Sequence, residues 1–375
     1  MQRANIVNSH PIVSILCISS NASFIKEISL APPVKALYWG MQKKVKNALT
    51  QALKLAFSLG LIYWLVRSDR LDFKALTSLL HPEYFIPCFI SLAISLLIAT
   101  ERWRHFLKSQ DLSIPFFKAF QLTLIGLFFS FAMPGGVGGD LVKGYYITKS
   151  SSHAKVAAAV TVFLDRLIGL LAMSLMALLV LCVEWPTVQT NHELVVIFMM
   201  VAGVVAASMV IWSLIFSRRL FNLGWVERIL KWLPRSRALL KAYYSVTEYR
   251  HSKQVFFSTL ALSFASQFAG ICFFVFAGRG LGYDLPLTTY LAVIPIAFMV
   301  QALPISPGGV GVGQWVSLFL FNLFAPNTGQ LGPTTTTAYQ IYQFLFGLVG
   351  AYFYLGISKK LKNPSPAPSQ TEEYT

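Results

Sequence analysis

The five-residue sequence Pro-Gly-Gly-Val-Gly occurs twice in this chain, at Pro134–Gly138 and at Pro307–Gly311. Each copy follows an apolar run that is too short to cross a bilayer. Proline lacks a backbone N–H and glycine loses the most backbone entropy on folding, so both residues end helices. Inside a membrane, a broken helix survives only where it is packed in protein or lines a cavity. Two matching breaks in two halves of a chain therefore indicate a binding site of the kind found in transporters.

The composition is that of a membrane protein. Hydrophobic residues make up 55% of the chain, charged residues only 12%, and the mean hydropathy is +0.59, whereas an average soluble domain has roughly 25% charged residues. The net charge of +16 lies in segments beside apolar runs, as the positive-inside rule requires. We therefore expect an all-α polytopic membrane protein that does not bind nucleic acid.

Six apolar segments are long enough to span the roughly 20 residues that a bilayer core requires. They are 48–66, 84–100, 156–183, 194–216, 255–277 and 335–357. Two further apolar pieces are short and interrupted by proline and glycine. These pieces are 119–133, before the first break, and 290–303, which resumes as 312–324 after the second.

Loop charges predict how the interrupted pieces lie. Segment 217–254 carries nine Lys and Arg against two acids, so it is predicted to be cytoplasmic, and segment 184–193 carries no Lys or Arg and is predicted to be outside. Counting back across the intervening spans makes both ends of 119–133 cytoplasmic. The same count places both ends of 290–324 outside.

The prediction is six transmembrane helices plus two re-entrant helical hairpins in an inverted-repeat arrangement, with both termini cytoplasmic in the cell (inner or plasma) membrane. The alternative is eight transmembrane helices joined by Gly-rich loops. Residues 1–40 are expected to be an N-terminal extension, since Met41 begins a basic lead-in and is an alternative start. Residues 41–362 form the expected transmembrane domain, and 363–375, rich in Pro, Ser and Gln, an expected disordered tail.

The first break supplies candidate anion-binding groups. Glycines leave backbone N–H groups accessible at the start of the returning helix, where the helix dipole favours an anion, and Lys143 adds a positive charge one turn further on. The predicted phosphate-binding residues are Gly135, Gly136, Gly138, Gly139, Asp140 and Lys143. The alternative is that these glycines only turn the chain and that Lys143 is solvated.

Asp165 and Arg166 are the charged pair inside a predicted span, where charges are costly and usually functional. Arg166 is expected to meet Asp140 or a lipid phosphate, and Asp165 to meet Lys143. The alternative is that the span begins near Leu167, which would leave both charges at the interface.

The second break and the end of the second span contain further polar residues and glycines of interest. The second break adds Gly308, Gly309 and Gln314 to the predicted site. Interfacial anchoring accounts for Glu101–Arg104, which closes the second span.

Several enzyme classes find no support in the sequence. It has no Gly-x-x-x-x-Gly-Lys-Ser/Thr loop for nucleotides, no His-Glu-x-x-His and no Cys-x-x-Cys, and its six His are scattered. We therefore expect no metal, no cofactor and no catalytic residue.

Four segments resemble the lysylphosphatidylglycerol synthase transmembrane-region family of flippase-like integral membrane proteins. They are Arg102–Arg104, Met133–Asp140, Phe163–Gly169 and Leu303–Gly311, in the family's order between about residue 45 and 358. Longer members carry a soluble aminoacyl-transferring domain, and lysyl transfer is not expected here.

The resemblance implies movement of an anionic lipid between leaflets, either a phospholipid or an isoprenoid-phosphate-linked sugar. The chain departs from the family pattern in having Lys143 where Arg is usual and Gln314 where an acid is frequent. The alternative function is a membrane-embedded glycosyl or lipid-modifying transferase with Asp140 or Asp165 as base. A third class is a non-transporting subunit with envelope-biogenesis partners. The sequence sets no oligomeric state.

Overall fold

The computed structural model describes residues 49, 52–53, 56, 59–68, 70–71, 74–132, 138–148, 154–216, 253–303 and 305–362. By its internal contacts the chain divides into residues 1–50 and 51–375, and the fold below is that of the second unit. Within the described ranges every regular element is helical, which confirms the predicted all-α fold. The predicted extension 1–40, the tail 363–375 and most of the basic segment 217–254 lie outside these ranges.

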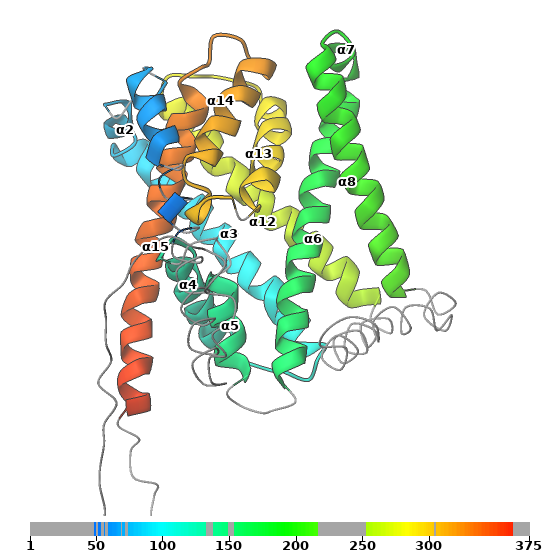
Figure 1. Ribbon diagram of the computed structural model, residues 1–375, viewed down its shortest axis with the longest axis vertical. Helices are drawn as coiled ribbons and strands as arrows, with labels where there is room; N and C mark the ends of the chain where they lie inside the picture. The colour runs from blue at the N-terminus through cyan, green and yellow to red at the C-terminus, as the bar shows by residue number, and fades with distance from the viewer. Residues whose placement is uncertain are drawn as a thin grey trace, which may run out of the picture. The chain divides into compact units, whose positions relative to one another are not determined.

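Long helices coincide with the predicted spans (Figure 1). Four of those in the described part are long and apolar enough to cross a membrane: α3 (Pro82–Lys108), α6 (Ala154–Val183), α8 (His192–Phe216) and α12 (Lys253–Gly280). The predicted span 335–357 lies within α15 (Leu331–Lys362). The first predicted span, 48–66, is described only in part and is helical at 59–67. Short helices α2 (Ala75–Ser78) and α7 (Trp185–Val188) lie in connections.

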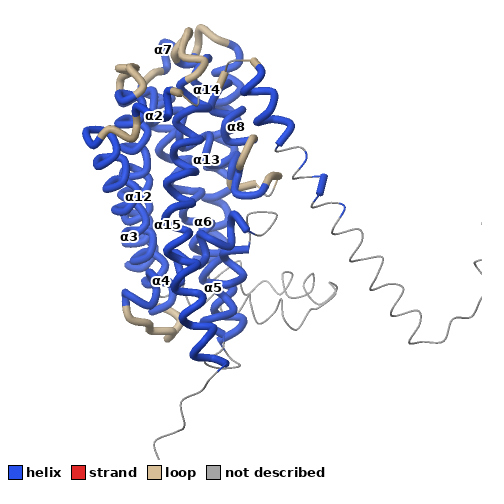
Figure 2. Tube along the Cα trace, turned by 90° about the vertical axis from the view of Figure 1, so that its left-hand side faces the viewer, coloured by secondary structure: helices blue, strands red, loops and turns tan. Residues whose placement is uncertain are grey.

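The two interrupted pieces form shorter helices. The first gives α4 (Phe116–Ala132) and α5 (Gly138–Thr148), and the second gives α13 (Leu287–Gln301), the 3₁₀ turn η3 (Pro307–Gly309) and α14 (Val312–Phe324). Figures 1 and 2 show the α4–α5 pair in the lower half of the helical unit and the α13–α14 pair in the upper half.

The α4–α5 hairpin begins and ends at the same end of the long helices. Trp103 near the end of α3, Ala119 at the start of α4, Ile147 at the end of α5 and Ala158 at the start of α6 share one apolar cluster. Because these four residues share one cluster, the α4–α5 hairpin ends close to the point where it begins.

The α13–α14 hairpin returns in the same way at the opposite end. Tyr290 at the start of α13 lies 5.7 Å from Phe321 near the end of α14, measured between ring centroids. Gly332 at the start of α15 packs on the backbone of Ser317. The number of membrane crossings and the inverted repeat stay predictions.

Each hairpin packs on the last long helix of the other half: α4 on α15, and α13 on α6. The long helices that precede the two hairpins, α3 and α12, pack on each other. At their contact the hydroxyl of Ser95 donates to the carbonyl of Ser266 (2.9 Å) and the hydroxyl of Ser266 donates to the carbonyl of Ser95 (3.0 Å). The two halves thus make matching contacts.

Glycines allow α4 to approach both of its neighbours closely. A Cβ atom at Gly139 of α5 would overlap the carbonyl oxygen of Gly126, and one at Gly350 of α15 would overlap the carbonyl oxygen of Leu124. Small residues at such contacts are typical of membrane helices that pack backbone against backbone. The position of α4 is therefore fixed from both sides.

Candidate functional site

An ion pair joins the end of α3 to the middle of α6. Arg102 donates from Nε to Oδ1 of Asp165 at 2.7 Å and from Nη2 to Oδ2 at 3.0 Å, and the two side chains are only 11% and 17% exposed. Nη1 of Arg102 also donates to the hydroxyl of Ser263 on α12 at 3.2 Å. A planar guanidinium can hold both oxygens of a carboxylate, which an ammonium cannot.

Arg102 corrects two interpretations made from the sequence. The predicted partner of Asp165 was Lys143, but Arg102 occupies both carboxylate oxygens. Interfacial anchoring is also an incomplete account of the Glu101–Arg104 segment, because Arg102 points into the helical unit and contacts α6 and α12.

The predicted pair between α5 and α6 is present. Arg166 contacts Oδ2 of Asp140 through Nε at 2.8 Å and through Nη2 at 2.7 Å, and its side chain is about half exposed. Asp140 lies in the first turn of α5, where the helix dipole stabilises a negative charge. This pair holds the start of α5 against α6, just after the first break.

The two ion pairs and Lys143 together form a charged cluster, made of Arg102, Asp140, Lys143, Asp165 and Arg166. The Nζ atom of Lys143 lies 5.2 Å from the ring centroid of Trp103, within the range of a cation–π interaction. Its side chain runs over Gly126, where a Cβ atom would lie 2.9 Å from the lysine Cε. Among the described side chains, the two carboxylates of the cluster bind arginines, and no ion pair involves Lys143. Three cations and two carboxylates leave one net positive charge.

The second break lies against the first hairpin. Gly308 and Gly309 have φ angles of 59° and 74°, in the left-handed region that glycine adopts most readily. A Cβ atom at Gly308 would lie 2.8 Å from Cδ1 of Phe131, and Phe131 is near the end of α4. The second break therefore contacts the end of α4, the helix that precedes the first break in the sequence. Gly135 and Gly136 of the predicted site lie outside the described residues, and Gly138 and Gly139 are buried in the first turn of α5.

Gln314 is fully buried and its amide is engaged within the fold. Its Oε1 atom accepts from the N–H of Gly311 at 2.8 Å, and its Nε2 atom donates to Oε1 of Gln340 at 2.8 Å and to the hydroxyl of Thr337 at 3.2 Å. These bonds close the second break and join α14 to α15. A binding role for Gln314 stays a prediction.

Two side chains beside the second break did not emerge as site residues from the sequence. Nε2 of Gln301 and the hydroxyl of Ser306 are buried without a hydrogen-bond partner among the described residues, although such groups are nearly always paired. Gln301 packs directly on Gly309 and Gly313. In the sequence, Gln301 is a polar residue in an apolar run, which fits a cavity lining and an interhelical hydrogen bond equally well, and Ser306 is marked only by the proline and glycines that follow it.

Two surface pockets lie away from the charged cluster. One of about 330 Å³ is on α14 and the start of α8, and one of about 440 Å³ includes Arg70, Tyr283 and Asn327. The side chains of the cluster form the pairs Arg102–Asp165 and Asp140–Arg166, and Lys143 contacts Trp103. Within the described ranges, no three His, Cys, Asp or Glu side chains are grouped to hold a metal ion.

Comparison with known proteins gives one family. Residues 51–351 match the model described as the lysylphosphatidylglycerol synthase TM region. A UPF0104 membrane protein of Pyrococcus horikoshii is 24% identical over 302 residues, which cover 74% of this chain and 87% of that protein. A UPF0104 membrane protein of Methanocaldococcus jannaschii is 33% identical over 89 residues, covering 24% of this chain and 26% of the relative. No solved structure matches the chain.

Proposed function

The chain belongs to the lysylphosphatidylglycerol synthase transmembrane-region family, and we propose that it moves an anionic lipid between the leaflets of a cell membrane. The substrate is a phospholipid or an isoprenoid-phosphate-linked sugar. The observation that supports this most directly is Lys143, a half-buried cation beside a helix break with no carboxylate of its own.

The charges of the cluster suit a phosphate. Arg102 and Arg166 are each neutralised by an aspartate, so the net positive charge is that of Lys143. A phosphate oxygen at Lys143 would also lie near the first turn of α5, whose backbone N–H groups and dipole favour an anion.

The cluster adjoins a surface that suits lipid chains. Phe163, one helical turn before Arg166 on α6, is more than half exposed, and so are Leu141 and Tyr145 on the face of α5 turned away from Lys143. In a membrane protein, exposed apolar side chains of this kind face acyl or prenyl chains. A lipid can therefore place its phosphate at Lys143 while its chains stay in the bilayer.

The contacts of Asp140 and Asp165 argue against the alternative function, a transferase in which one of them is the general base. Asp165 accepts hydrogen bonds from Arg102 at both oxygens, and Asp140 binds Arg166. Both carboxylates are thus occupied by a guanidinium, whereas a general base must be free to contact the group from which it takes a proton.

The orientation proposed for the chain follows from its loop charges. With both termini cytoplasmic, the α4–α5 hairpin enters from the cytoplasm and the α13–α14 hairpin from outside. The contact between Phe131 of α4 and Gly308 of the second break then lies between the leaflets. The lipid moves past this contact.

The test is lipid movement in vesicles that contain the purified full chain. Fluorescent phosphatidylglycerol is placed in both leaflets, and an impermeant reductant bleaches the outer pool. In parallel vesicles the probe is a fluorescent isoprenyl-phosphate-linked sugar. Loss of the protected signal is expected to be faster with the protein for at least one probe. Rates equal to those of protein-free vesicles for both probes would contradict the proposal.

A matched pair of variants tests whether the rate of lipid movement depends on Lys143. Lys143→Gln is expected to slow movement about tenfold, because a hydrogen bond to a charged group contributes about 1.5–3 kcal/mol. Lys118→Gln removes an exposed lysine from α4 of the same hairpin and is expected to leave the rate unchanged. Equal rates for the two variants would contradict the role of Lys143.

A further inference from the structure

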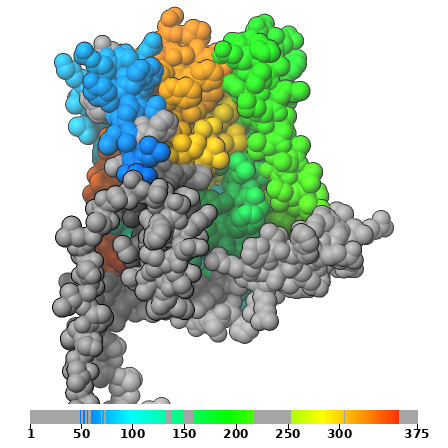
Figure 3. All heavy atoms as spheres, in the orientation of Figure 1, coloured from blue at the N-terminus to red at the C-terminus, as the bar shows by residue number. Residues whose placement is uncertain are grey.

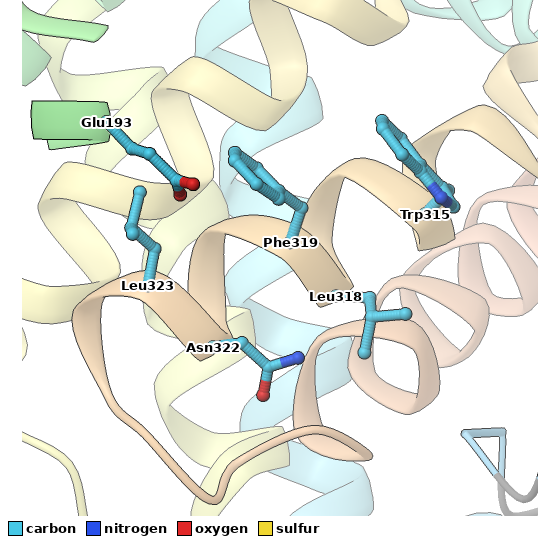
Figure 4. A pocket seen from close by; sticks show the side chains of 6 residues that line it. All are labelled: Glu193, Trp315, Leu318, Phe319, Asn322 and Leu323. Atoms are coloured by element: carbon cyan, nitrogen blue, oxygen red, sulfur yellow. The ribbon is translucent and has the colours of Figure 1, made fainter. Parts of the chain in front are cut away.

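A pocket of about 330 Å³ lies between the outer face of α14 and the start of α8. Its lining residues are Glu193, Trp315, Leu318, Phe319, Asn322 and Leu323 (Figure 4). The surfaces of α14 and of the α7–α8 region lie side by side at this end of the helical unit (Figure 3). The pocket shares no residue with the charged cluster and is on the other hairpin.

The pocket combines one carboxylate with two aromatic rings. Glu193 is the charged residue among those that line it, and its side chain extends from α8 toward Phe319 and Leu323 (Figure 4). Trp315 and Phe319 are one helical turn apart, with ring centroids 6.2 Å apart and planes within 8° of each other. No ion pair involves Glu193 among the described residues, and segment 184–193 has no Lys or Arg.

A carboxylate beside aromatic faces is the chemistry that recognises an ammonium group. The carboxylate supplies a full negative charge, and the ring faces attract the same cation through their quadrupoles. Asn322 adds an amide that can donate a hydrogen bond to a neighbouring oxygen. An anion alone is disfavoured, because Glu193 would repel it.

The rest of the pocket is aliphatic, and apolar side chains at its edge are exposed. Leu318 and Leu323 line it, and Trp315 and Phe319 are themselves exposed. We infer that this pocket binds the headgroup of a membrane lipid that carries an ammonium group, such as phosphatidylethanolamine. The ammonium lies against Glu193 and the two rings, and the acyl chains extend along the exposed apolar face of α14.

The test is lipid binding to the purified full chain in detergent, measured by native mass spectrometry. The protein is titrated with phosphatidylethanolamine or phosphatidylglycerol of identical acyl chains. Glu193→Gln and Trp315→Leu are each expected to lower bound phosphatidylethanolamine at least about threefold, the scale of one exposed cation–π contact or ion pair. Phosphatidylglycerol binding is expected to stay the same, which also shows that the variants are folded.

Glu184→Gln is the control. Glu184 precedes α7 in the same segment and does not line the pocket, so its replacement should leave phosphatidylethanolamine binding unchanged. Equal effects of Glu193→Gln and Glu184→Gln would overturn the inference, as would parallel losses of both lipids. Binding of soluble ethanolamine to the lipid-free protein at least as tightly as phosphatidylethanolamine would also overturn it, since it would identify a soluble amine as the occupant.

Discussion

Arg102 on α3 and Asp165 on α6 meet through two parallel hydrogen bonds of 2.7 and 3.0 Å, in a site where both side chains are mostly buried. The pair neutralises two charges that would be costly at that depth in a membrane. It also occupies Asp165, so that Lys143 makes no ion pair among the described residues.

Breaking this pair should destabilise the fold. Arg102→Gln leaves Asp165 as an uncompensated charge, and we expect the free energy of unfolding to fall by about 3 kcal/mol. Arg166→Gln should cost no more than about 1 kcal/mol, because Arg166 is half exposed. Chemical denaturation in detergent measures both. The double variant Arg102→Gln/Asp165→Asn should be more stable than Arg102→Gln alone. If its loss of stability equals the sum of the losses of Arg102→Gln and Asp165→Asn measured separately, the two side chains are not directly coupled.

The contact between α4 and α5 should tolerate no side chain at Gly139. Gly139→Ala places a Cβ against the carbonyl oxygen of Gly126, and we expect a loss of at least about 2 kcal/mol of stability. Gly144→Ala on the same helix meets nothing within 4 Å, and should be neutral or stabilising by up to about 1 kcal/mol. Thermal unfolding followed by size-exclusion chromatography compares them. Similar melting temperatures for the two variants would show that the hairpin is packed differently.

The hairpin topology predicts the accessibility of two loop positions. Single cysteines at Ser109 and Ser151, in a chain without its native cysteines, should both resist an impermeant thiol reagent added outside intact cells, because the loop charges predict that both positions are cytoplasmic. Both should react after the membrane is permeabilised. If one position reacts in intact cells and the other does not, α4 or α5 crosses the membrane and the eight-helix alternative holds.

Gln314 should matter for stability. Gln314→Leu leaves the N–H of Gly311 and the amide of Gln340 without the partner they have now, and an unmet buried group costs about 1–3 kcal/mol. We expect a loss of about 3 kcal/mol in chemical denaturation. Thr337→Val removes one weaker partner of the same amide and should cost about 1 kcal/mol. A tolerated Gln314→Leu would mean that the second break does not depend on this network.

Local sequence signals predicted the helices and the breaks well. Apolar length located the spans, and Pro-Gly-Gly located the ends of α4 and α13, because helix length and helix breaking are properties of neighbouring residues. The Asp140–Arg166 pair was also anticipated, since Asp140 is in the first hairpin and Arg166 is in the helix that follows it. The contact from Gln314 to Gly311 spans only three residues, a spacing typical of helix caps, and could have been expected from the sequence.

Pairings between distant helices were not predictable in this way. Arg102 and Asp165 are 63 positions apart, and a single sequence gives no rule for which buried arginine meets which aspartate. An arginine beside a tryptophan at the end of a span also has a sufficient local explanation in interfacial anchoring. The pocket at Glu193 depends on α8 and α14 coming together, and neither segment predicts the other.

The glycine contact between α4 and α5 has a consequence for how this family of chains can vary. Because Gly126 and Gly139 bring two backbones together, the depth of the Lys143 ammonium is set by main-chain geometry. The apolar residues elsewhere on the hairpin do not determine it. They can therefore diverge during evolution, in size and in shape, without displacing the charge. Relatives that keep a cation at this position are expected to retain the two glycines even where the rest of the hairpin has little sequence in common.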